Sequence, residues 1–214
     1  MKRLLLSGLA TLFILICSLL NSFLVYGQDQ ALDQRVKKFL EKNSGRWYDM
    51  NVPGSDGKVL YDIIIKNNYT KALEIGTSTG HSGIWIAWAL SKTGGKLITI
   101  EIDKSRHEEA LHNFEEAGLS EYIDARNGDA HKLVKELDGP FDFVFSDADK
   151  GWYKNYFTDV DPKLVKGGCF TAHNVNNRYG GIKEFLDYVE NLPNYNTTIN
   201  RSSSSGVSIS YKLK

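Results

Sequence analysis

Short apolar segments alternate with amphipathic segments from residue 71 onward, and this alternation constrains the fold more than any other feature of the sequence. The predicted strands are residues 71–75, 96–101, 122–127, 141–146 and 169–172, and the predicted helices are residues 81–90, 105–117, 130–137, 152–159 and 182–191. Regular alternation of this kind requires a mainly parallel sheet with helices on both faces. Residues 195–200 and 207–213 are predicted to close the sheet as a hairpin.

The composition supports a single globular domain of this α/β class. The chain has 214 residues, of which 42% are hydrophobic and 24% charged, and this is enough to bury a sizeable core. Its formal net charge is zero and it has no long cluster of lysine and arginine, so nucleic acid is not an expected partner. We therefore expect the partner to be a small molecule.

The N-terminal part of the chain differs from the rest. Lys2 and Arg3 precede an almost uninterrupted apolar stretch over residues 4–25, so residues 1–27 are predicted to be a signal peptide or an N-terminal membrane anchor. This predicts an exported protein, or one anchored at the cell envelope through this segment alone, rather than a cytoplasmic one. Residues 28–69 are predicted to form a helical cap, with turn residues over 51–57 and a helix over 59–66, and residues 70–214 the ligand-binding domain.

A glycine-containing loop follows the first predicted strand. In Glu74-Ile-Gly-Thr-Ser-Thr-Gly80, the two glycines permit a tight turn and close approach of a ligand to the backbone. The next helix then directs its N-terminus at the ligand. The loop differs from the dinucleotide pattern G-x-G-x-x-G, because three residues separate the glycines and Glu74 precedes them. This combination favours S-adenosylmethionine over a dinucleotide.

A second acidic residue ends the next predicted strand. Glu101 lies 21 positions after Gly80, and a carboxylate in this place can accept hydrogen bonds from both ribose hydroxyls of a nucleoside. Alone, the glycines could form an ordinary strand-to-helix turn, and Glu101 could be a solvated strand end. Together, at this spacing, they predict a nucleoside-type ligand.

Further reactive side chains follow two later strands. Asp147 and Lys150 come after residues 141–146, and His173 and Asn174 come after residues 169–172. Ligands of open parallel sheets lie beyond the carboxyl ends of the strands, so these side chains are expected to converge on one site.

The ordered set of motifs resembles the class I S-adenosylmethionine-dependent O-methyltransferases of the catechol and caffeoyl-CoA type. The matching segments are Met50-Asn-Val52 and residues 72–82, 99–103, 127–130, 141–150 and 167–168, within a resemblance that spans residues 51–213. The resemblance implies a Rossmann-like, seven-stranded, mostly parallel sheet with an antiparallel last strand. It also implies methyl transfer to a hydroxyl of a small aromatic acceptor, catechol-like or hydroxycinnamoyl-like, and a homodimer.

The resemblance also assigns roles to individual residues. Those expected to bind the cofactor are Val52, Glu74, Gly76, Ser78, Gly80, Ser82, Glu101, Asp129, Ala130 and Asp147. Within this set, Glu101 is expected at the ribose and Asp129 with Ala130 along the adenine edge. Lys150 is expected to assist deprotonation of the acceptor, and Asp147 and Asn174 match metal ligands.

His173 departs from the family pattern, which has an aspartate directly before the asparagine. A site made of Asp147, His173 and Asn174 would suit manganese, iron or zinc better than magnesium, because it has less negative charge than a site with two carboxylates. The alternative is a metal-free site in which His173 is the general base, since an unperturbed imidazole has a pKa of about 6.5. Both hypotheses remain open at this stage.

Two other functions are compatible with parts of the sequence. One is an envelope protein that binds S-adenosylmethionine but has lost turnover through the change at His173. The other, a nicotinamide-dependent oxidoreductase, is disfavoured because G-x-G-x-x-G is absent. Acceptor choice is expected to depend on Trp47, Tyr48 and Met50 in the cap and on the loop over residues 176–181.

Overall fold

The computed structural model describes residues 29–48 and 50–213. A helix over residues 29–42 is followed by α2 (Gly54–Asn67), α3 (His81–Thr93), α4 (Lys104–Ala117), α5 (Ala130–Glu136), α6 (Tyr153–Val160) and α7 (Gly180–Val189). The strands are β1 (Lys71–Ile75), β2 (Lys96–Glu101), β3 (Ile123–Asn127), β4 (Phe141–Ser146), β5 (Leu164–His173), β6 (Tyr195–Asn200) and β7 (Val207–Lys212). Short 3-10 turns occupy Ser120–Tyr122, Lys150–Trp152 and Asp161–Lys163.

The strands of the described chain form one seven-stranded sheet in the order β3-β2-β1-β4-β5-β7-β6. Strands β1 to β5 pair in parallel, whereas β7 is antiparallel to both of its neighbours. This confirms the predicted fold class and the closing hairpin. The strand order reverses between β1 and β4, and a reversal of this kind opens a crevice at the carboxyl ends of the two strands.

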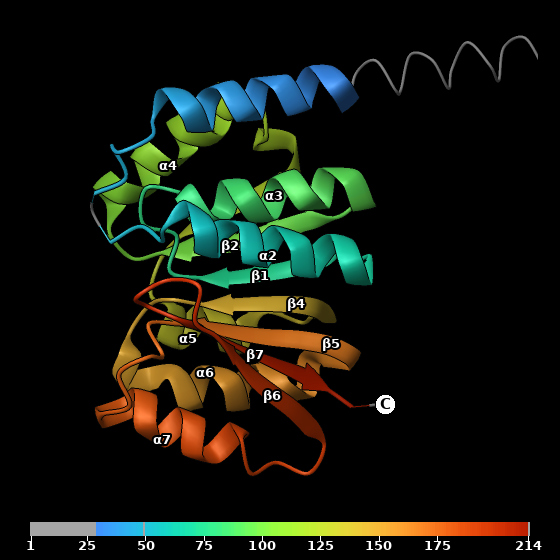
Figure 1. Ribbon diagram of the computed structural model, residues 1–214, viewed down its shortest axis with the longest axis vertical. Helices are drawn as coiled ribbons and strands as arrows, with labels where there is room; N and C mark the ends of the chain where they lie inside the picture. The colour runs from blue at the N-terminus through green and yellow to red at the C-terminus, as the bar shows by residue number, and fades with distance from the viewer. Residues whose placement is uncertain (1–28, 49, 214) are drawn as a thin grey trace, which may run out of the picture.

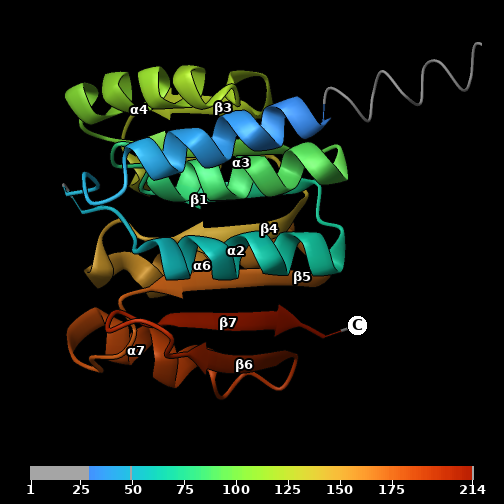
Figure 2. The same cartoon turned by 45° about the horizontal axis from the view of Figure 1, so that its top comes forward.

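Helices cover both faces of the sheet (Figures 1 and 2). α2, α3 and α4 lie on one face and α5, α6 and α7 on the other, and the helix over residues 29–42 packs on α3 and α4 through Val36 and Phe39. Phe143 and Phe145 of β4 face α2 and α3, while Val144 faces α5 and α6. The central strands are therefore apolar on both sides, as a doubly covered parallel sheet requires.

Two predicted elements begin five residues earlier in the structure than expected. α2 starts at Gly54, five residues before the expected helix, so most of the predicted turn over residues 51–57 is its first turn. Pro53 caps this helix in an extended conformation, and glycines near a helix start need not interrupt it. β5 also begins earlier, at Leu164 rather than residue 169, because Gly167 in a left-handed conformation lets the strand continue through an irregular register with β4.

The predicted leader over residues 1–27 lies outside the described residues. In the described part of the chain, no helix is long and apolar enough to span a bilayer. The two helices of the predicted cap pack against α3 and share their apolar clusters with it, so they belong to the same single domain as the sheet.

Candidate active site

A cavity of about 470 Å³ lies at the carboxyl ends of β1, β2, β4 and β5. This volume is within the range of small-molecule sites. The predicted site residues that line it are Gly76, Ser78, Ser82, Glu101, Asp129, Ala130, Asp147, Lys150, His173 and Asn174. The topology thus gathers residues that are up to 98 positions apart in the sequence, counted from Gly76 to Asn174, at the crevice where the strand order reverses between β1 and β4.

The loop after β1 packs directly against the loop after β4. Gly76 has φ of 98°, and a Cβ atom there would lie 2.9 Å from the backbone nitrogen of Ala148. Only glycine fits this position without moving backbone. The backbone N–H of Asp147 donates to the Ile75 carbonyl at 2.8 Å, which holds the same two loops together from the other side.

Glu101 anchors the glycine loop from the end of β2. Its Oε2 accepts a hydrogen bond from the backbone N–H of Ser78 at 2.7 Å, and its Oε1 accepts one from the N–H of Asp103 at 2.9 Å. Each carboxylate oxygen has a second lone pair. Glu101 can therefore hold the loop and still accept hydrogen bonds from a ligand in the cavity.

Glu74 is fully buried below the loop rather than on the cavity wall. Its Oε2 accepts a hydrogen bond from the Thr99 hydroxyl at 2.6 Å, and its Oε1 has no partner among the described residues. Burial raises the pKa of Glu74 to about 8, although the hydrogen bonds it accepts act in the opposite direction. The carboxyl group is consequently mostly neutral at pH 7.

The edge of the cavity beyond β3 is formed by the start of α5. Asp129 caps this helix by accepting a hydrogen bond from the backbone N–H of His131 at 3.0 Å. The His131 ring is stacked with Tyr156, with ring centroids 5.7 Å apart, and both residues line the cavity. Nothing in the sequence indicated that His131 and Tyr156 would contribute a pair of stacked rings to the cavity beside Ala130.

Asp147 and Lys150 form an ion pair in the wall of the cavity. The Lys150 ammonium donates to Asp147 Oδ1 at 2.6 Å and to the Asp147 carbonyl at 2.9 Å. The Asp147 side chain is only 8% exposed, whereas that of Lys150 is 37% exposed. The ammonium can therefore reach a ligand while its partner carboxylate remains buried.

His173 lies beside Asp147 because of the sheet register. Ser146 of β4 pairs with Ala172 of β5, so the residues that follow them emerge as neighbours. His173 Nδ1 is 3.1 Å from Asp147 Oδ2, and its Nε2 is 2.9 Å from Oδ2 of Asp56 in the first turn of α2. Sequence reasoning missed Asp56, because it lies in the segment predicted as a turn.

Both ring nitrogens of His173 therefore face carboxylate oxygens. An ionised carboxylate only accepts hydrogen bonds, so a ring that donates to two ionised carboxylates carries a proton on each nitrogen and is an imidazolium. Burial acts to lower the pKa of His173, but the hydrogen bonds and charges of Asp147 and Asp56 outweigh it and raise this pKa above its usual value. This arrangement leaves no lone pair for the hypothesis that His173 is the general base.

The same geometry does not fit the predicted metal site. Both oxygens of Asp147 already accept from cationic donors, Lys150 and His173, and the imidazole has no free nitrogen. Among the described residues, no cluster of histidine, cysteine and acidic side chains is arranged to hold an ion. Asp56 Oδ1 is buried without a partner in the described structure, but one oxygen supplies only a single ligand.

Three predicted cofactor residues do not line the cavity. These are Glu74, Gly80 and Val52. Gly80, with φ of 98°, packs against Phe114 of α4 and ends the loop at the start of α3. Val52 is buried on the other side of the cap loop, and its carbonyl accepts from His81 Nδ1 at 2.8 Å. A direct contact of these residues with the cofactor stays a prediction without support from the geometry.

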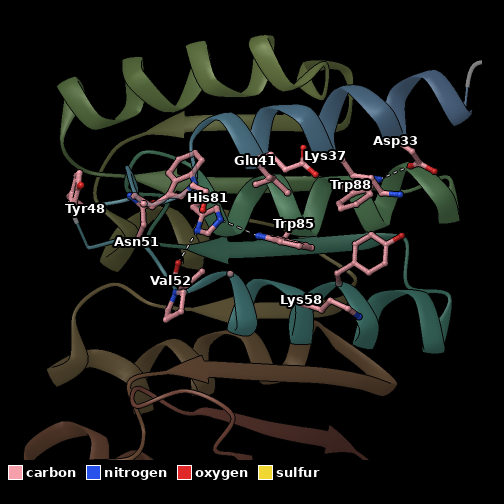
Figure 3. Close-up of a pocket in the computed structure, with 17 residues that line it drawn as sticks. Asp33, Lys37, Glu41, Tyr48, Asn51, Val52, Lys58, His81, Trp85 and Trp88 are labelled. Atoms are coloured by element: carbon pink, nitrogen blue, oxygen red, sulfur yellow. Dashed lines mark hydrogen bonds between the residues drawn. The ribbon is translucent and has the colours of Figure 1, made fainter.

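A second, wider cavity of about 980 Å³ lies between the helix over residues 29–42 and α2, with α3 as its floor (Figure 3). Three tryptophans, Trp47, Trp85 and Trp88, are among its lining residues. Trp47 stacks on His81 with ring centroids 4.4 Å apart, and burial lowers the pKa of His81 to about 4, so this ring is neutral. Asn51 lines both cavities, while Met50 lines only the first and Trp47 and Tyr48 only the second.

Comparisons with known proteins agree with the geometry. The family described as O-methyltransferase matches residues 24–191. A catechol O-methyltransferase of Niastella koreensis is 40% identical over 130 residues, which are 59% of this chain and 58% of that protein. A caffeoyl-CoA O-methyltransferase of Populus kitakamiensis is 30% identical over 166 residues, which are 75% of this chain and 69% of that protein.

Solved structures show the same architecture. The O-methyltransferase from Bacillus cereus, in complex with S-adenosylhomocysteine, superimposes with a TM-score of 0.73 at 26% identity and covers 85% of this chain and 91% of its own. The sheet order, the antiparallel β7 and the cavity at the strand reversal define a Rossmann-like domain of the methyltransferase type. The chain belongs to the O-methyltransferase family.

Proposed function

We propose that this protein transfers the methyl group of S-adenosylmethionine to a hydroxyl group of a small aromatic acceptor. The observation that carries the proposal is the ion pair of Lys150 and Asp147, which opens into the same cavity as the glycine loop and Glu101. The names of the relatives support the acceptor class, and the ligand of the Bacillus cereus structure supports the cofactor.

The side chains of the cavity suit each requirement of the reaction. Glu101 can accept hydrogen bonds from the ribose, and the stacked rings of His131 and Tyr156 can flank the adenine. The Lys150 ammonium stabilises the acceptor oxygen as it becomes an anion, which lowers the pKa of the acceptor hydroxyl, and the proton leaves to water. The oxygen then bonds to the methyl carbon, the carbon–sulfur bond breaks, and S-adenosylhomocysteine leaves.

A rigid cavity is itself a source of rate acceleration. Holding acceptor oxygen and methyl carbon in line replaces a bimolecular encounter by a positioned one. The contact of Gly76 with the backbone of Ala148 and the anchoring of Ser78 by Glu101 supply this rigidity on the cofactor side.

The proposal is tested by calorimetric titration of the purified protein with S-adenosylmethionine, S-adenosylhomocysteine and NAD. We expect the first two to bind and NAD not to bind, and we expect Glu101→Ala to abolish binding. A panel of catechols and hydroxycinnamoyl compounds then tests methyl transfer. Cofactor binding without transfer to any acceptor would favour a binding protein that lacks turnover, and preference for NAD would overturn the proposal.

The site of action stays part of the proposal. The leader predicted for residues 1–27 supports export or anchoring at the cell envelope. Cell fractionation with N-terminal sequencing of the mature protein tests this, and recovery of the full-length chain in the cytosol would contradict it. The homodimer implied by the family resemblance stays a prediction, which sedimentation of the purified protein tests.

A further inference from the structure

We propose that His173, clamped between Asp56 and Asp147, takes the place of a divalent cation, so that this protein binds its cofactor and transfers methyl without a metal ion. The inference rests on the proposed function and adds to it how the charge of the site is balanced. It treats His173 as a positioning residue that acts through Asp147.

The His173 ring is enclosed between two buried carboxylates. The His173 side chain is 3% exposed and that of Asp56 is 1% exposed, and the ring lies between two carboxylates from different elements. Its contacts of 3.1 Å and 2.9 Å are ordinary hydrogen-bond lengths, so no ion can lie between the ring and either oxygen. The clamp is therefore a completed structure rather than a set of open ligands.

Asp56 is itself held in place by a second hydrogen-bond donor besides His173. Asp56 Oδ2 also accepts a hydrogen bond from the Ser203 hydroxyl at 2.6 Å, in the loop between β6 and β7. Residues of α2, β5 and this loop thus meet at one carboxylate oxygen. Because Asp56 is held by two donors, it can orient the imidazole ring, and the ring in turn orients Asp147 toward Lys150.

The charges of the cluster balance one another without a metal ion. The cluster contains two carboxylates, Asp56 and Asp147, and two cations, Lys150 and the His173 imidazolium, so it is neutral without an ion. An aspartate at position 173, as in the family pattern, would change the charge by two units. That is the charge a divalent cation supplies, so the histidine and the metal are alternative solutions to the same electrostatic requirement.

The experiment compares the wild type with His173→Asp and His173→Gln. Binding of S-adenosylhomocysteine is measured first, because it shows that each variant is folded and tests the cofactor site independently of this inference. Manganese and magnesium are then titrated into each saturated protein, and methyl transfer is measured with catechol or any acceptor found in the panel, with excess chelator and with added manganese.

For the wild type we expect no saturable manganese binding and full activity in chelator. His173→Asp should bind manganese saturably, and it should lose activity in chelator but recover it with manganese. His173→Gln should lose at least about tenfold in kcat, with little change in the KM for the cofactor, and manganese should not restore it.

Three results would overturn the inference. They are stoichiometric manganese binding by the wild type, loss of wild-type activity in chelator, and unchanged kcat in His173→Gln. If His173→Asp fails to bind S-adenosylhomocysteine, the wild type and His173→Gln still decide the question. If no acceptor is found, manganese binding decides it without turnover, so failure of the proposed function is distinguishable from failure of the clamp.

Discussion

Gly57 of α2 and Trp85 of α3 are in direct contact, and a Cβ atom at Gly57 would lie 2.2 Å from Cδ1 of the tryptophan ring. The two helices can approach this closely only because position 57 has no side chain. Trp85 cannot easily move away, since its Nε1 donates to His81 Nε2 at 3.2 Å. The contact thus links the cap to the helix that follows the glycine loop.

We expect Gly57→Ala to lower the free energy of unfolding by about 1–3 kcal/mol, because the added methyl overpacks the helix interface. Gly54→Ala is the matched control, since it lies on the same helix and a Cβ atom there would meet nothing within 4 Å. It should be neutral or slightly stabilising. Urea denaturation measures both, and an equal loss in the two variants would show that the Trp85 contact is not the cause.

Gly76→Ala should weaken S-adenosylhomocysteine binding at least about tenfold, because its positive φ and its contact with the Ala148 backbone both exclude a side chain. Gly167→Ala is the control. Gly167 also has positive φ, at 80°, but a Cβ atom there would meet nothing within 4 Å, and the residue does not line the cavity. Titration calorimetry should show that Gly167→Ala binds S-adenosylhomocysteine with unchanged affinity. A similar loss of affinity in Gly76→Ala and Gly167→Ala would mean that backbone strain alone, rather than the contact with Ala148, is the cause.

Glu74 should make the unliganded protein less stable as pH rises. Its pKa is raised from 4.5 to about 8 in the fold, so the folded state holds a proton that the unfolded state releases over this interval. The contribution of Glu74 to the free energy of unfolding is fully present below about pH 4.5 and is lost as pH rises through 8. At about 1.4 kcal/mol per pKa unit, the loss is at most about 5 kcal/mol.

Glu74→Gln removes this titration. The fall in Tm between pH 5 and pH 9 should therefore be smaller in the variant than in the wild type. Thermal denaturation across this range without cofactor is the measurement. Parallel curves for the two proteins would mean that Glu74 is already ionised in the folded protein at pH 5.

Lys150→Met should reduce kcat about 10²- to 10⁴-fold, because it removes the cation that we propose stabilises the acceptor oxyanion. The affinity for S-adenosylhomocysteine should change little, since Glu101 and the glycine loop remain. Lys154→Met is the control, because Lys154 is in the next helix and pairs with Glu184 on the surface, 2.9 Å away. Steady-state kinetics check this, and an equal loss in the control would remove the specific role of Lys150.

Much of the fold could be predicted because it depends on local patterns. Buried parallel strands such as residues 141–146 have continuous apolar runs, and the glycine loop has a spacing that only a tight turn after a strand explains. The start of α2 could not be predicted, because glycine, serine and aspartate are common to turns and to first helical turns. Pro53 and the packing against α3 decide between the two.

Some residues of the candidate site could likewise be predicted from the sequence, and others could not. Asp147, Lys150 and His173 could be identified because each lies at or just beyond the carboxyl end of a strand, and parallel strands end at one edge of the sheet. Nothing in the sequence indicated that Asp56, 117 positions before His173, would hold its second ring nitrogen. That contact depends on how α2 packs over the sheet.

The α/β class of the fold and the nucleoside-type ligand could be predicted from the sequence, since strand and helix periodicity, the glycine loop and the position of Glu101 are properties of short segments. The protonation state of His173, by contrast, depends on the tertiary structure. A histidine after a strand can be a base, a metal ligand or a buried cation, and the choice depends on which groups face its two nitrogens. Here those groups are carboxylates from α2 and from the end of β4, and their hydrogen bonds and charges outweigh the effect of burial and raise the pKa of His173.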